Sequence, residues 1–175
     1  MLNVRVGGTC IDDHLADLNI SGGSYPEDGN HTHLIWVNDL QLQLGQVVTV
    51  SFLEHASSSH AGKTIDELFP DEKTTAVTDS KPTAEIFNEL RDKPKLRDKF
   101  SFRAASSYGN AFAGTTPPDE HGFGFSVLWN SHHPERTRVS LHSYTLDGLE
   151  SHAPMNNHFE ERLNYGGSVR FELIA

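Results

Sequence analysis

Hydrophobic side chains recur along this chain mainly at every second residue. Phe123, Phe125, Val127 and Trp129 are each separated by one intervening residue. This period places alternate side chains on the same face of a β-strand. Seven segments show this pattern and are expected to be strands: 2–6, 33–37, 47–55, 100–105, 123–129, 137–144 and 169–174.

Two short helices are expected between the strands in the middle of the chain. One spans 64–69 and ends before Pro70, and the other begins after Thr83 and ends before Pro94. Stretches 19–30 and 106–121 are rich in Gly, Ser or Pro, so we expect loops there.

Short strands separated by turn residues predict a mainly β fold, either an antiparallel β-sandwich or a barrel with one or two short helices. A length of 175 residues suits a single domain. Segments 42–53 and 163–174 share the spacing Leu-x2-Gly-x2-Val followed by alternating apolar residues. They raise the alternative of an internal duplication, with halves 1–70 and 97–175 joined by a helical or polar connection at 71–96.

The first 55 residues also carry a family-like pattern. Gly7-Gly8 is followed by His-Leu-Ile-Trp at 33–36, and then by Leu42, Gly45 and Val48, with Gln46 in a position where the pattern has Asp. In this the chain resembles small bacterial proteins of unassigned function with a Gly-Gly, His-Leu-x-Trp, Leu-x-x-Gly-Asp-x-Val pattern. The resemblance implies a bacterial origin and brings no catalytic residues with it.

Acidic residues are concentrated in the first half of the chain. The net charge is −10, and residues 1–90 hold fourteen acids against four bases, whereas residues 91–175 hold ten of each. Such a field opposes nucleic acid and anionic membranes and attracts a basic protein. We therefore expect a non-enzymatic acidic binding protein, for example a bacterial immunity-type protein that docks a basic partner. The candidate contact residues are Glu27, Asp28, Asp39, Asp66, Glu67, Asp71 and Glu72.

A metal site is the enzymatic alternative. His31 and His33 are two residues apart, so on a strand both imidazoles point to one side and can bind one ion, as in the His-x-His of cupins. The third ligand would be a distant histidine such as His142. This alternative describes a metal-dependent β-barrel enzyme, whereas the preferred function needs no cofactor.

Two further features bear on function and location. Trp36 and Trp129 can stack on a sugar ring, which gives the alternative of a small-molecule or carbohydrate-binding module, although their apolar neighbours favour core packing. The lone Cys10 can form no internal disulfide. The start of the chain does not resemble a signal peptide and no apolar run reaches about 18 residues, so we expect a cytoplasmic protein.

Overall fold

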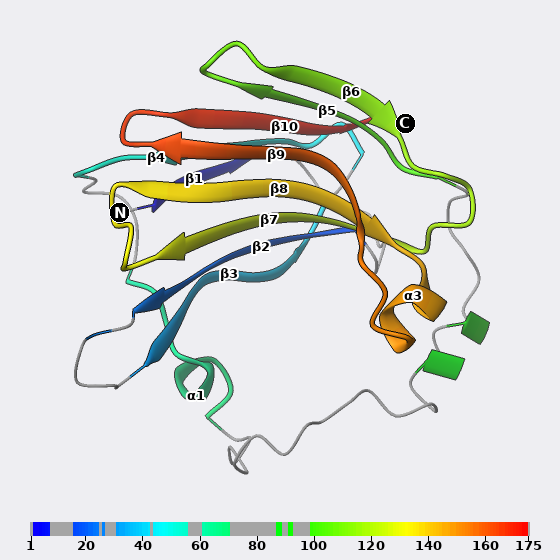
Figure 1. Ribbon diagram of the computed structural model, residues 1–175, viewed down its shortest axis with the longest axis horizontal. Helices are drawn as coiled ribbons and strands as arrows, with labels where there is room; N and C mark the ends of the chain where they lie inside the picture. The colour runs from blue at the N-terminus through cyan, green and yellow to red at the C-terminus, as the bar shows by residue number, and fades with distance from the viewer. Residues whose placement is uncertain are drawn as a thin grey trace.

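The strands form two five-stranded sheets that pack face to face (Figure 1). The computed structural model describes residues 2–7, 16–24, 26, 31–42, 44–55, 61–70, 87–88, 91–92 and 99–174. The first sheet has the strand order β1-β4-β10-β5-β6 and the second the order β3-β2-β7-β8-β9. The elements are β1 (Leu2–Gly7), β2 (Ala16–Ser24), β3 (Thr32–Gln41), β4 (Val47–Phe52), α1 (Ile65–Leu68), β5 (Ser101–Ser106), β6 (Ala111–Thr115), β7 (Gly122–Asn130), β8 (Arg136–Tyr144), α3 (Leu146–Glu150), β9 (Asn156–Asn164) and β10 (Ser168–Ile174).

The predicted mainly β sandwich is confirmed, and each of the seven predicted strands is present. Three strands were not predicted: β2, which occupies part of the expected loop 19–30, β6 within the expected loop 106–121, and β9. Helix α1 is confirmed, and Thr64 caps it by accepting a hydrogen bond from the Glu67 amide. Of the expected second helix, residues 87–88 and 91–92 are helical and the remainder lies outside the described residues.

Phenylalanine rings from both sheets make up the centre of the core. Phe125 of β7 stacks on Phe171 of β10 with ring centroids 5.1 Å apart, and Phe102 of β5 meets Phe123 of β7 at 4.8 Å. All four side chains are almost completely excluded from solvent. These contacts bind one sheet to the other, because each pair takes one ring from each sheet.

Strands β4 and β10 lie side by side about an approximate two-fold axis. Thr49 faces Arg170, while Val48 faces Phe171 and Val50 faces Val169. The Gly45 amide donates to the Leu173 carbonyl, and the Gly166 amide donates to the Phe52 carbonyl, each at 2.8 Å. Corresponding positions are therefore 121 residues apart (173 minus 52, and 166 minus 45).

The same separation relates strands of the second sheet. Leu18 and Ile20 of β2 correspond to Val139 and Leu141 of β8, and all four are buried. A register shift follows Ile20 in the β2–β3 pair and Leu141 in the β8–β9 pair. The β2–β3 pair has a further shift between Leu18 and Ile20 that the β8–β9 pair lacks, so the two registers agree only in part. The internal duplication therefore stays a prediction.

Strand β7 lies on the axis of this repeat. Phe125 faces Leu18 of β2 and Leu141 of β8, whereas Val127 faces Ile20 and Val139. The axis thus passes through Ser126. A strand on a two-fold axis must run parallel to one of two symmetry-related neighbours and antiparallel to the other, which explains why β2–β7 is parallel and β7–β8 is antiparallel.

Candidate functional site

Polar side chains gather on the outer face of the second sheet. Because side chains alternate along a strand, the buried Val139 and Leu141 of β8 leave Arg138, Ser140 and His142 on the opposite face. Strands β2, β7 and β9 add outward-facing polar side chains beside them. The inner strands of the second sheet thus carry polar side chains on their outer face, and no described residue packs over that face.

These side chains line a shallow hollow of about 540 Å³, which we call the groove. Its lining residues are Asn19, Ser21, Ser126, Val127, Leu128, Arg138, Ser140, His142, Met155, Asn157 and Glu160. A second hollow of about 230 Å³ shares Leu128 and Arg138 with it. Its other lining residues are Asn130, His133, Arg136, Thr137 and Arg162. The two hollows thus adjoin along β7 and β8.

His142 is the histidine that lines the groove. Burial, together with the positive charge of Arg138 and the neighbouring His158, lowers the pKa of His142 below its ordinary value of 6.5. The imidazole is therefore neutral near pH 7. It presents one hydrogen-bond donor and one acceptor.

A second titratable cluster lies close by, at one end of the sandwich. The Ser143 hydroxyl and His158 Nε2 are 2.6 Å apart, and the imidazole ring packs against Phe102 and Phe123. The carboxylate of Glu120 is 3% exposed; one oxygen accepts from the Asn156 side chain, and the other has no hydrogen-bond partner among the described residues. Burial lowers the pKa of His158, and Glu120 partly opposes that shift.

This cluster contains the residue types of a nucleophile and its base, but it lacks access. Ser143 is 0% exposed, so no substrate carbonyl can approach its hydroxyl in this conformation. The residue 121 positions before Ser143 is Gly22, where an added Cβ would lie only 3.0 Å from ring and backbone atoms of Trp129. The two ends of the sandwich therefore differ: tryptophan packing occupies one end and a polar cluster the other.

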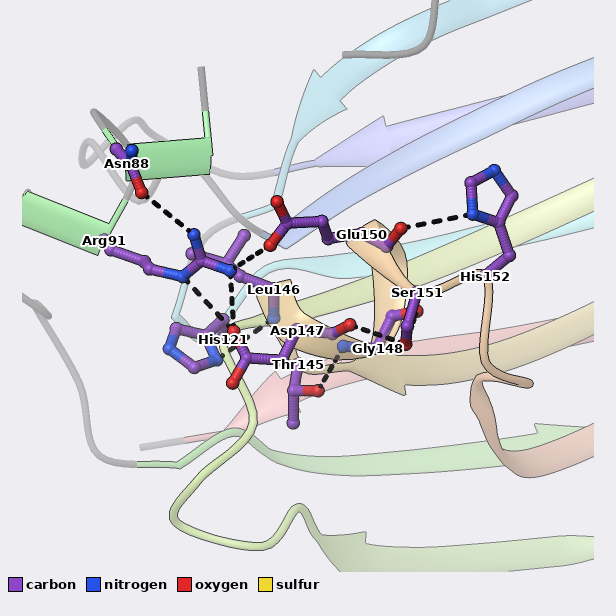
Figure 2. A network of polar contacts seen from close by, with 10 residues as sticks. All are labelled: Asn88, Arg91, His121, Thr145, Leu146, Asp147, Gly148, Glu150, Ser151 and His152. Carbon is purple, nitrogen blue, oxygen red and sulfur yellow. Dashed lines mark hydrogen bonds and ion pairs between the residues drawn. The ribbon is translucent and has the colours of Figure 1, made fainter. Parts of the chain in front are cut away.

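Helix α3 closes the same end of the molecule. Figure 2 shows that Arg91 donates to Asp147 at 2.7 and 3.2 Å and also contacts Glu150. Thr145 caps the helix, and His121 Nδ1 accepts from the Leu146 amide at 3.4 Å. Arg91 also donates to Asn88 Oδ1 at 3.1 Å, so these exposed contacts link residues 88 and 91 to α3.

The three histidines of the metal alternative do not come together. His33 faces Gly23 of β2, whereas His142 faces Gly124 of β7, which in turn lies beside Asp17 of β2. Six residues of β2 separate the two rows, or roughly 20 Å along the strand. His31 and His33 are both exposed, and the described residues contain no group of three or more side chains suited to a metal ion.

The predicted acidic contact residues are only partly described. Asp66 and Glu67 are exposed on α1, and the Glu67 carboxylate accepts from the Thr64 amide at 2.8 Å. Asp39 lies in β3, and its side chain is outside the described set. Glu27, Asp28, Asp71 and Glu72 lie outside the described residues, as does Cys10.

The two tryptophans pack against each other. Their rings meet edge to face at 6.4 Å, both are partly buried against the core, and Trp129 Nε1 donates to the Pro134 carbonyl at 3.3 Å. The predicted core packing is therefore observed. Residues of the groove that come from β2 and β9 were missed by the sequence reading, because neither strand was predicted.

None of the helices in the described part of the chain is long and apolar enough to span a membrane. Compared with known proteins, the chain matches no protein-family model, no curated protein and no solved structure.

Proposed function

We propose that this chain is a non-enzymatic binding module that holds a small polar molecule in the groove. The observation that carries this proposal is the gathering of polar side chains in a hollow at the centre of a sheet face that no described residue covers. A volume of about 540 Å³ falls within the range of roughly 300–1,000 Å³ that is usual for small-molecule sites.

The groove offers hydrogen-bonding groups that the fold itself does not use. Ser126, Ser140, Arg138 and His142 form no side-chain hydrogen bond with another described residue, whereas Asn157 donates to Glu160 at 3.2 Å. Because these groups project from paired strands, the backbone positions that carry them are set before a ligand arrives. Preorganisation of this kind reduces the entropy cost of binding.

Nuclear magnetic resonance tests the proposal directly. Amide shifts would be followed while monosaccharides, uronic acids, amino acids and nucleosides are added in turn to the full chain. We expect at least one class to shift the amides around Ser126, Ser140 and Asn157 saturably. Ser126→Leu, which fills the middle of the groove, should weaken that binding at least about tenfold.

Thr49→Leu is the matched control, because Thr49 lies near the same axis on the other sheet and does not line the groove. It should leave binding unchanged. Shifts confined to residues outside the groove, or none with any class, would rule the proposal out.

The acidic docking function is a second proposal, and helix α1 favours it. Ile65 and Phe69 are 47% and 38% exposed and flank Asp66 and Glu67. Apolar side chains beside carboxylates suit a basic protein partner, since burial would supply affinity and charge would speed association.

Salt-dependent capture tests this second proposal. The wild-type chain should retain a basic protein at low salt and release it at high salt, and Asp66→Lys should retain much less. Asp119→Lys makes the same charge change at an exposed site in the second half and should behave as wild type. Equal losses in both variants would indicate a general charge effect and contradict docking at α1.

A further inference from the structure

Two arginines face each other across neighbouring strands where the groove adjoins the smaller hollow. Arg138 lines both hollows, whereas Arg162 lines the smaller one. Arg138 of β8 and Arg162 of β9 are direct register partners, and both are exposed. Neither forms an ion pair within the described part of the chain. Like charges placed directly opposite one another destabilise a sheet, so this pair has a cost that something else must offset.

The fold does not require this pair. The separation of 121 residues makes Asp17 of β2 the counterpart of Arg138 and Gln41 of β3 the counterpart of Arg162. Asp17 and Gln41 are register partners, as the two arginines are. The first half therefore builds the same position without two like charges. The arginine pair is therefore particular to the second half.

A third arginine lies beside the pair. Arg136 and His133 line the adjoining hollow of about 230 Å³ with the pair. Glu135 approaches Arg136 at 4.0 Å and His133 at 3.9 Å. Glu160, the one carboxylate lining the groove, lies two residues before Arg162 and accepts a hydrogen bond from the neighbouring groove side chain of Asn157 at 3.2 Å.

We propose that the groove binds a small molecule carrying an oxyanion, either a carboxylate or a phosphate, and that this group sits between Arg138 and Arg162. The inference rests on the proposed function, because it assigns chemistry to one end of the same groove. Guanidinium groups present paired N–H donors that match the geometry of oxyanions, and an anion between the two arginines removes their repulsion.

Inorganic phosphate is the simplest probe. Titration into the chloride form of the full chain should shift the side-chain Nε–Hε resonances of Arg138 and Arg162 saturably in the millimolar range. In parallel, glucose 6-phosphate and glucuronate should each bind at least about tenfold more tightly than glucose, which distinguishes an organic anion from free phosphate and from the sugar alone.

Variants give a readout in stability as well as binding. Arg138→Gln should abolish the phosphate response, and in chloride it should raise the Tm by about 1–3 °C because the repulsion is relieved. Arg170→Gln is the control, since Arg170 lies on the outer face of the other sheet and should leave the phosphate response intact.

The outcomes separate this inference from the proposed function. A phosphate response that survives Arg138→Gln, or one that spreads equally over exposed arginines, overturns the oxyanion site. Neutral ligands that bind in the groove while anions do not would overturn the inference and leave the proposed function standing. If neither neutral nor anionic probes shift groove resonances, both are overturned.

Discussion

At the scale of single residues, His158 illustrates how the two ends of the core differ. It lies beside the register shift of the β8–β9 pair, and its ring is 6.3 Å from that of Phe123. Phe123 and Trp129 lie three residues before and three residues after Ser126 on β7, and so at opposite ends of the core. The Trp129 ring has the Trp36 ring as its neighbour, with centroids 6.4 Å apart. A titratable ring thus occupies one end of the core where an indole occupies the other.

The lowered pKa of His158 and of His142 gives stability a defined pH dependence. As pH falls through 6.5, the unfolded chain takes up protons on these residues before the folded chain does. Protonation therefore favours the unfolded state. Their contribution to stability is complete above 6.5 and is lost as the pH falls toward the folded-state pKa values.

We expect the urea midpoint to fall between pH 7.5 and pH 5.5, and to fall less in His158→Gln. Glutamine keeps a polar partner for Ser143 and does not titrate. His33→Gln, which replaces an exposed histidine of β3, should show the wild-type pH dependence. Equal pH dependence in all three proteins would show that His158 is not the group responsible.

At the scale of secondary-structure elements, sequence patterning found the strands whose alternation is uninterrupted. It missed β2, which contains Gly22 and Gly23 and two register shifts. It also missed β9, where a shift breaks the alternation, and β6, whose Ala and Gly carry little pattern. Whether a segment with a bulge or many small residues forms a strand depends on contacts with neighbouring strands. The hydrophobic period along that one segment does not reveal these contacts.

The candidate site was predicted even less completely, for a related reason. Of the predicted site residues that are described, His142 alone lines the groove, although the sequence assigned it to a metal. The groove combines β2, β7, β8 and β9, and two of these strands were not expected. Strand order, which brings residues 19 and 160 to one surface, is a property of the sheet and not of any local motif.

The two turns that share the Leu-x2-Gly spacing should respond alike to substitution. Gly45 and Gly166 have φ angles of 74° and 83°, and an added Cβ would meet no atom within 4 Å at either site. Substitution by alanine at either site should therefore lower the free energy of unfolding only by the cost of a left-handed backbone conformation, about 1 kcal/mol or somewhat more.

We expect Gly45→Ala and Gly166→Ala to lower the free energy of unfolding by similar amounts in urea titrations. Asparagine, which tolerates this conformation better, should cost less at both positions. Strongly unequal costs for the two alanine variants would argue against equivalent turns.

At the scale of the whole molecule, the repeat does not divide the protein into independent halves. β4 of the first half pairs with β10 of the second, and β2 pairs with β7. Leu2 of β1 pairs with Phe52 and Phe102 of β5 pairs with Leu173, so β1 and β5 correspond, but they are 100 residues apart (102 minus 2). The other counterparts are 121 residues apart. The difference of 21 residues reflects the additional β6 and β7 of the second half. The inserted β7 then joins β2 to β8, so both sheets are continuous across the halves.

Continuity of both sheets predicts one cooperative unfolding transition. Ile20→Val in the first half should cost about 0.5–1.5 kcal/mol and Leu173→Ala in the second about 2–5 kcal/mol, since both side chains are fully buried. Each variant should move the transitions seen by far-ultraviolet circular dichroism and by tryptophan fluorescence to the same new midpoint.

If either variant separated the two transitions, the halves would have to unfold independently, and strand pairing across the axis would then contribute little to stability. Coincident transitions would mean that the pairing of β4 with β10 and of β2 with β7 makes a single folding unit from the repeated halves.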